Sequence, residues 1–68
     1  PNPIESSFHI RVNEVKADVL VFDVYGAIVY KSQLVDGNSE IDASGLPPGL
    51  YVLKVQGQSL YQKKLIKR

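Results

Sequence analysis

Short runs in which apolar and polar residues alternate are the dominant pattern of this chain. Phe8, Ile10 and Val12 fall on one face of an extended segment, with polar residues between them. Similar runs follow at roughly the 8–12-residue spacing that is typical of sandwiches and barrels, and glycine or proline separates them. The predicted strands are residues 8–12, 19–24, 27–33, 39–42, 50–55 and 60–66. No stretch shows a sustained 3.6-residue period, so we expect no helix.

The breaks between these runs carry residues that turn chains. A Tyr-Gly pair at 25–26 and an Asp-Gly pair at 36–37 predict tight turns, because glycine adopts positive φ without a Cβ clash. Residues 44–49 contain two consecutive prolines, which cannot donate to a sheet ladder, and therefore predict an irregular crossing. The expected fold is all-β: a small antiparallel β-sandwich, Ig-like, of six to seven strands. The seventh strand would come from residues 1–5 or from a split at Leu34.

Two of the predicted strands, residues 19–24 and 50–55, carry apolar side chains on both faces. A two-layer antiparallel sandwich buries only one face of each strand. Either the small domain curves enough to bury both faces, or an apolar strip faces outward and invites a partner. In the second case, two copies of the chain would associate weakly through the sheet face.

The length and composition of the chain indicate one small domain without disulfide bonds. Its 68 residues include no cysteine, so neither a disulfide nor a thiolate zinc site forms, and 44% apolar residues must supply the core. The net charge of +1 gives no field that would attract nucleic acid. No apolar run approaches the roughly 20 residues of a membrane helix.

Few residues of the sequence are candidates for catalysis, metal binding or sugar binding. The single histidine, His9, lies on the polar face of the first predicted strand, where an exposed side chain is the ordinary explanation. Residues 36–40 begin like a calcium loop, but Ile41 stands where such a loop needs glycine. The four tyrosines are spread over separate segments and there is no tryptophan, which weakens the case for a sugar-binding platform. We therefore expect no catalytic residue, no metal, no cofactor and no small-molecule substrate.

The chain ends in a basic strand, Lys63-Lys64-Leu65-Ile66-Lys67, followed by one arginine. Lysines on an edge strand guard against pairing with other chains. A basic, accessible terminus is equally a handle for a receptor. The residues alone leave these two explanations open.

Four segments in this order resemble the type IX secretion C-terminal sorting domains of the type A class. They are Pro1-Asn2-Pro3, the run FDVYGAIV at 22–29, the run IDASGLPPGLYVLKV at 41–55, and the closing KKLIK at 63–67. The likeness covers nearly the whole chain. A second proline at position 48 stands where many members have a small residue, and a rigid turn tolerates either.

The resemblance implies a secretion signal rather than an enzyme. Such a domain ends an exported cargo protein, is recognised in the periplasm by shuttle proteins and the outer-membrane translocon, and is then removed by a sortase-like protease. Residues 1–68 would thus be a single sorting domain excised from a larger cargo protein that reaches the cell surface or the medium. The expected recognition segment is residues 63–67. The other motif residues would mainly hold the fold: Pro1, Asn2, Pro3, Gly26, Leu46, Pro48, Gly49 and Tyr51.

Two other classes share this architecture. One is an Ig-like or fibronectin-like spacer or adhesin module of a cell-surface protein, which would occur in tandem copies. The other is an accessory carbohydrate-binding module, which titration with polysaccharides would reveal.

Overall fold

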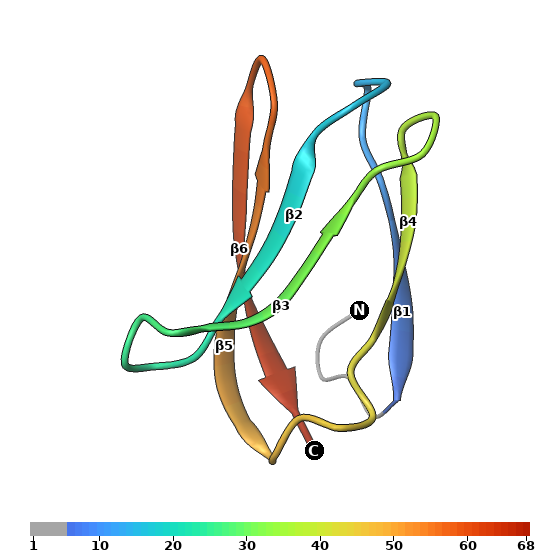
Figure 1. Cartoon of the computed structure of the whole chain (residues 1–68). Coiled ribbons are helices and arrows are strands. Elements are labelled where there is room, and N and C mark those ends of the chain that lie inside the picture. The colour runs from blue at the N-terminus through green and yellow to red at the C-terminus, as the bar shows by residue number, and fades with distance from the viewer. Residues whose placement is uncertain (1–5) are drawn as a thin grey trace.

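The computed structural model describes residues 6–68, which form six β-strands in two antiparallel sheets (Figure 1). The strands are β1 (Ser7–Arg11), β2 (Asp18–Phe22), β3 (Ile28–Gln33), β4 (Asn38–Asp42), β5 (Gly49–Gln56) and β6 (Leu60–Lys67). One sheet pairs β1 with β4, and the other has the order β3-β2-β5-β6. The described chain contains no helix, and hence none that could cross a membrane. The expected small β-sandwich is confirmed.

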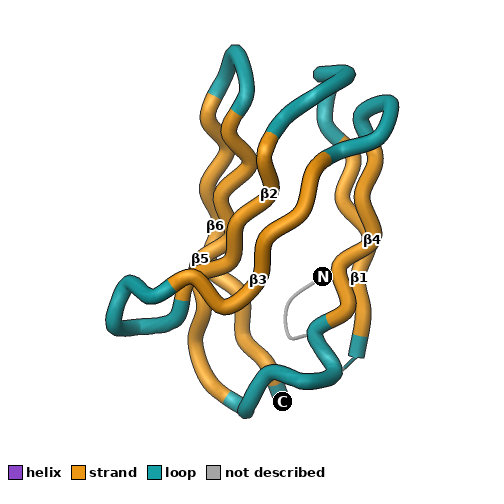
Figure 2. The backbone as a smooth tube through the Cα atoms, viewed as in Figure 1, coloured by secondary structure: helices purple, strands orange, loops and turns teal. Residues whose placement is uncertain are grey.

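The two sheets face each other (Figure 2). The buried apolar side chains between them form one core. The four-stranded sheet contributes side chains from alternate positions of β2 and β5, as the period-2 pattern requires. Across from them, Phe8 of β1 and Ile41 of β4 close the core, and Ile41 is fully buried. The buried apolar residues are Phe8, Ala17, Val19, Val21, Leu34, Ile41, Ala43, Tyr51, Leu53, Val55 and Leu65.

Strand β2 ends at Phe22, two residues earlier than the sequence predicts. Asp23 ends the strand, because its Oδ1 accepts hydrogen bonds from the amides of Tyr25 (2.9 Å) and Ala27 (3.0 Å). Gly26 completes the loop with a φ of 83°. The expectation that Val24 continues the strand is therefore wrong, and its side chain is 64% exposed in the turn.

The Asp-Gly turn before β4 is confirmed in detail. Asp36 and Gly37 both have positive φ, 51° and 77°, which is the two-residue type I′ geometry. Val35 and Asn38 flank the turn and exchange both backbone hydrogen bonds, at 2.8 and 3.0 Å. The turn therefore holds the start of β4 in register.

A seventh strand does not arise at Leu34. This residue is buried and donates its amide to the carbonyl of Ala17 at 3.0 Å, in the link between β3 and β4. The alternative origin, residues 1–5, lies outside the described residues, as do Pro1, Asn2 and Pro3.

The doubly apolar strands bury only one of their two faces. Val19 and Val21 of β2 point into the core, whereas Leu20 and Phe22 on the opposite face are only partly buried. On β5, Leu50 remains 45% exposed. Curvature of the sheet therefore does not bury the second face, and an apolar strip does face outward.

Candidate functional site

The terminal strand β6 is an edge strand of the four-stranded sheet (Figure 1). Its register on β5 sets the direction of every side chain, because residues directly opposite each other share a face. Leu65 lies opposite the core residue Tyr51 and is 2% exposed. Ile66, one residue later, lies opposite Leu50 on the outer face and is 48% exposed.

The three lysines of this strand have different surroundings. Lys67 follows Leu65 on the inner face and is only 8% exposed, and its ammonium donates to the carbonyl of Arg68 at 3.0 Å. Lys64 is exposed on the outer face, opposite Val52. Lys63 is exposed although it lies on the inner side. The proposed recognition segment thus divides into two anchored residues, Leu65 and Lys67, and three accessible ones.

Lys63 borders an apolar cleft between β1 and β6. Phe8 and Ile10 form one wall of this cleft, and Leu53 and Tyr61 belong to the other. The side chain of Lys63 is exposed, and β6 is an edge strand of its sheet. A lysine on an edge strand opposes pairing of that strand with other chains.

The residues around the double proline brace the crossing between the sheets. Tyr51 is buried, and its hydroxyl donates to the carbonyl of Pro47 at 2.6 Å. Leu46 packs partly buried against the core, Pro48 is exposed, and Gly49 opens β5. Tyr51 of β5 is thus hydrogen-bonded to the crossing segment that precedes this strand.

The crossing segment starts at an aspartate turn. The Asp42 carboxylate accepts the amide of Ser44 at 3.0 Å. Hydrogen bonds from the Ser44 side chain and amide lower the pKa of Asp42 below its ordinary value of 3.8. The charged form of Asp42 therefore favours the folded turn.

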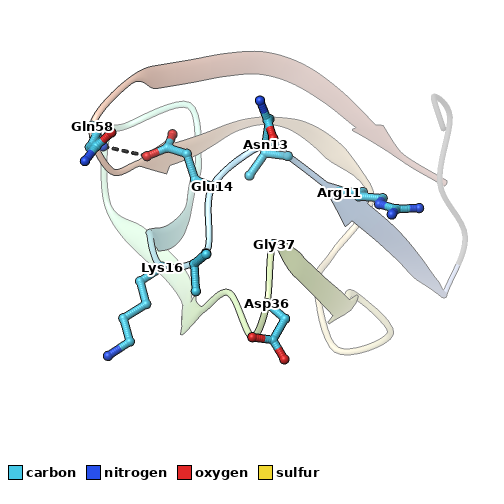
Figure 3. Close-up of a pocket in the computed structure, with 9 residues that line it drawn as sticks. Arg11, Asn13, Glu14, Lys16, Asp36, Gly37 and Gln58 are labelled. Carbon is cyan, nitrogen blue, oxygen red and sulfur yellow. Dashed lines mark hydrogen bonds between the residues drawn. The ribbon is translucent and has the colours of Figure 1, made fainter.

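A hollow at the opposite end of the sandwich is built around Glu14 (Figure 3). The carboxylate of Glu14 accepts the amide of Gln58 at 2.6 Å and that of Ser59 at 3.4 Å. Two backbone hydrogen bonds tie the Asp-Gly turn to the same loop. The Val12 amide donates to the Gly37 carbonyl (2.9 Å), and the Gly37 amide donates to the Val15 carbonyl (3.3 Å). The contacts of Glu14 and Gly37 therefore join three loops at this end of the sandwich.

The residues singled out for catalysis or metal binding do not gather. His9 is exposed, and its Nε2 lies 3.1 Å from Oδ1 of Asn38. Within residues 6–68, no three His, Asp or Glu side chains stand close enough to hold a metal ion.

Sequence reasoning missed two structural carboxylates, Asp23 and Glu14. An aspartate two residues before a Tyr-Gly pair is a recognisable turn signal for Asp23. Glu14 has no such signal, because its partner amides lie 44 and 45 residues away in the chain.

Comparison with known proteins adds the remaining observation. A family model described as a secretion system C-terminal sorting domain matches residues 1–68. Over 61 residues the chain is 28% identical to a protein named Beta-agarase A from Zobellia galactanivorans. That alignment covers 87% of this chain and only 11% of the agarase, so the chain corresponds to a small part of that relative.

Proposed function

This chain belongs to the family of secretion system C-terminal sorting domains, and from that premise we propose that it is a non-catalytic signal that carries a cargo protein through the outer membrane. The match of the family model to residues 1–68 is the observation that carries the proposal. A domain of this family marks its protein for type IX secretion, to the cell surface or the medium.

The finer steps of this proposal concern the path of the cargo. Residues 1–68 form one domain that is part of a larger exported protein. The domain passes through the periplasm, where shuttle proteins and the outer-membrane translocon bind it. A sortase-like protease then removes it from the cargo. The fold supports this role, because a tag must fold beside unrelated cargo, and residues 6–68 enclose a core of their own.

We assign recognition to the accessible part of the terminal strand. Lys63, Lys64 and Ile66 are exposed, whereas Leu65 and Lys67 hold the strand on the sandwich. The motif residues Gly26, Leu46, Pro48, Gly49 and Tyr51 shape turns and the crossing between the sheets, and we propose that they serve the fold. The same structural role is proposed for Pro1, Asn2 and Pro3.

The test is export of a reporter with a signal peptide at its N-terminus and residues 1–68 at its C-terminus, in a bacterium with type IX secretion. Deleting the terminal strand would remove the core residue Leu65 and unfold the domain, so a charge reversal at two exposed lysines, K63E/K64E, is the sharper change. R11E/K16E changes the net charge equally at exposed positions outside the terminal strand.

The unmodified fusion and R11E/K16E should both reach the surface, and K63E/K64E should remain in the periplasm as a folded protein. Retention of the unmodified fusion would contradict the sorting function. Normal export of K63E/K64E would contradict only the assignment to the terminal strand.

A further inference from the structure

The sheet of β1 and β4 is narrower than the sheet that it covers. It has two strands against four, and β1 stands on one side of the apolar cleft that β6 borders on the other. Every second residue of β6 belongs to the inner face, because it lies opposite a core residue of β5. Of these, Leu65 is buried, whereas Tyr61 is 41% exposed and Lys63 is exposed as well. The inner side of β6 at residues 61–63 is therefore uncovered, and we refer to it as the β6 ledge.

The edge of β1 beside this ledge has backbone groups that β4 does not use. At one end of the β1–β4 ladder the Val12 amide donates to the Gly37 carbonyl at 2.9 Å, and at the other end the Ala43 amide donates to the Ser6 carbonyl at 2.7 Å. Because only alternate pairs of an antiparallel ladder exchange hydrogen bonds, the even-numbered residues of β1 are the ones bonded to β4. The amides and carbonyls of the odd-numbered residues, with His9 at the centre, point away from β4. No strand of residues 6–68 pairs with them.

A strand added at this edge would lie over the β6 ledge and direct every second side chain into the cleft. The cleft has a volume of about 380 Å³, and apolar side chains dominate its walls, among them Ile10, Leu53 and Val55. The matching strand therefore has apolar residues at alternate positions.

One inward side chain of the ledge is charged. Lys63 is a lining residue of the cleft, and no carboxylate of residues 6–68 lines it. The carboxylates of neighbouring segments are directed elsewhere. Glu14 accepts two backbone amides of the turn between β5 and β6, and Glu40 lies on the outer face of the small sheet, opposite His9. A purely apolar strand would cover the ammonium without pairing it, whereas a strand with an aspartate or glutamate beside Lys63 would pair with it.

We propose that the free edge of β1 receives an extended segment of a partner protein, with apolar residues at alternate positions and a carboxylate that pairs with Lys63. The segment becomes a third strand of the small sheet. Its backbone hydrogen bonds supply affinity, and its inward side chains supply selectivity. The proposal rests on the sorting function, and the partner belongs to the secretion machinery.

A second copy of the chain does not fit this edge. If the β1 strands of two copies paired in one continuous sheet, they would lie only about 4.8 Å apart. The β6 ledge of each copy reaches beyond its own β1, so the two ledges would occupy the same space. The two Lys63 ammonium groups would also come together, which opposes association. A single added strand avoids both conflicts.

Export of the reporter fusion tests the proposal with two pairs of variants. H9P removes the amide donor at the centre of the free edge and places the proline ring there, while the hydrogen bonds to β4 remain. E40P is its control, because Glu40 is the β4 partner of His9 and its amide points to the opposite edge of the same sheet. K63E reverses the charge on the ledge, and K31E makes the same change at an exposed residue of β3, the other edge strand of the large sheet. Thermal melts of the purified domains establish which variants fold, and K63E decides alone if H9P does not.

H9P and K63E should each lower surface export at least about tenfold, the effect of losing about 1.4 kcal/mol of binding, while E40P and K31E export like the unmodified fusion. Normal export of either folded cleft variant, or an equal loss in its control, would overturn the added strand and leave the sorting function standing. Failure of the unmodified fusion itself would refute the sorting function, and the added strand with it. Sedimentation that shows a dimer of the unmodified domain and a monomer of H9P, with export of H9P unchanged, would assign the edge to a second copy instead.

Discussion

Replacing Gly37 with alanine should destabilise the domain much more than the same change at Gly26. Both glycines have nearly the same left-handed φ, 77° and 83°, so the backbone strain of the new side chain is alike. Their surroundings differ. A Cβ at Gly26 meets no atom within 4 Å, whereas at Gly37 it would lie 2.7 Å from the Val12 carbonyl oxygen and 2.9 Å from that of Glu14.

The magnitudes follow from these contacts. The left-handed backbone conformation costs an alanine about 1–2 kcal/mol of stability. Alanine also lowers the conformational entropy of the unfolded chain relative to glycine, which offsets roughly 0.4–1 kcal/mol of that cost. G26A should therefore lose about 1 kcal/mol. At Gly37 the backbone must also shift, which breaks its hydrogen bonds with Val12 and Val15 at about 1 kcal/mol each. G37A should therefore lose about 3 kcal/mol.

Thermal and urea unfolding of the isolated domain measure the difference. A domain of this size melts roughly 4–8 °C lower for each kcal/mol lost, so G26A should melt about 5 °C lower and G37A more than 10 °C lower. A stability of roughly 0.05–0.15 kcal/mol per residue gives about 3–10 kcal/mol for 68 residues, so G37A loses a large share of the total. Equal losses of stability in G26A and G37A would show that the nearby carbonyl oxygens of Val12 and Glu14 do not make position 37 more sensitive to a side chain.

Three further changes test other contacts. Y51F removes the hydroxyl that bonds the Pro47 carbonyl and should cost about 1 kcal/mol in urea unfolding, and an unchanged midpoint would show that the bond does not brace the crossing. E14A removes the oxygens that accept the Gln58 and Ser59 amides, so it should cost about 1 kcal/mol and speed hydrogen exchange at the Gln58 amide, and unchanged exchange would argue against that contact. The lowered pKa of Asp42 means that its contribution is present above pH 3.8 and is lost as pH falls through the lower folded value. D42N should therefore melt below the unmodified domain at pH 7 and approach it in acid, and an equal gap at both pH values would contradict the assignment.

The strands were predictable because burial on one face imposes a period of two on the sequence. Phe8 and the isolated inward residue Ile41 are buried in the structure, and Ile10 and Val12 pack partly buried against the same core. The Asp-Gly turn was equally predictable, since few residue pairs favour positive φ at both positions. Val24 was misplaced because an aspartate side chain ended the strand before the apolar run did.

Which residues of the terminal strand are accessible depends on how β6 pairs with β5, and local sequence patterns do not reveal that pairing. In the sequence, residues 63–67 look like a basic, accessible terminus, and only the register on β5 shows that Leu65 and Lys67 point inward. Similarly, the double apolar pattern of β2 left two explanations open. The arrangement of the sheets decides between them, because no element of the described chain forms a layer over the outer face.

Surface export of the reporter fusion tests the central claim most directly. The fusion carrying residues 1–68 should appear on the cell surface or in the medium when the type IX translocon is intact, and should accumulate inside the outer membrane when the translocon is deleted. The same reporter without the domain should be retained in both strains. Equal export with and without the translocon, or retention of the fusion in the intact strain, would contradict the assignment of this domain as a sorting signal.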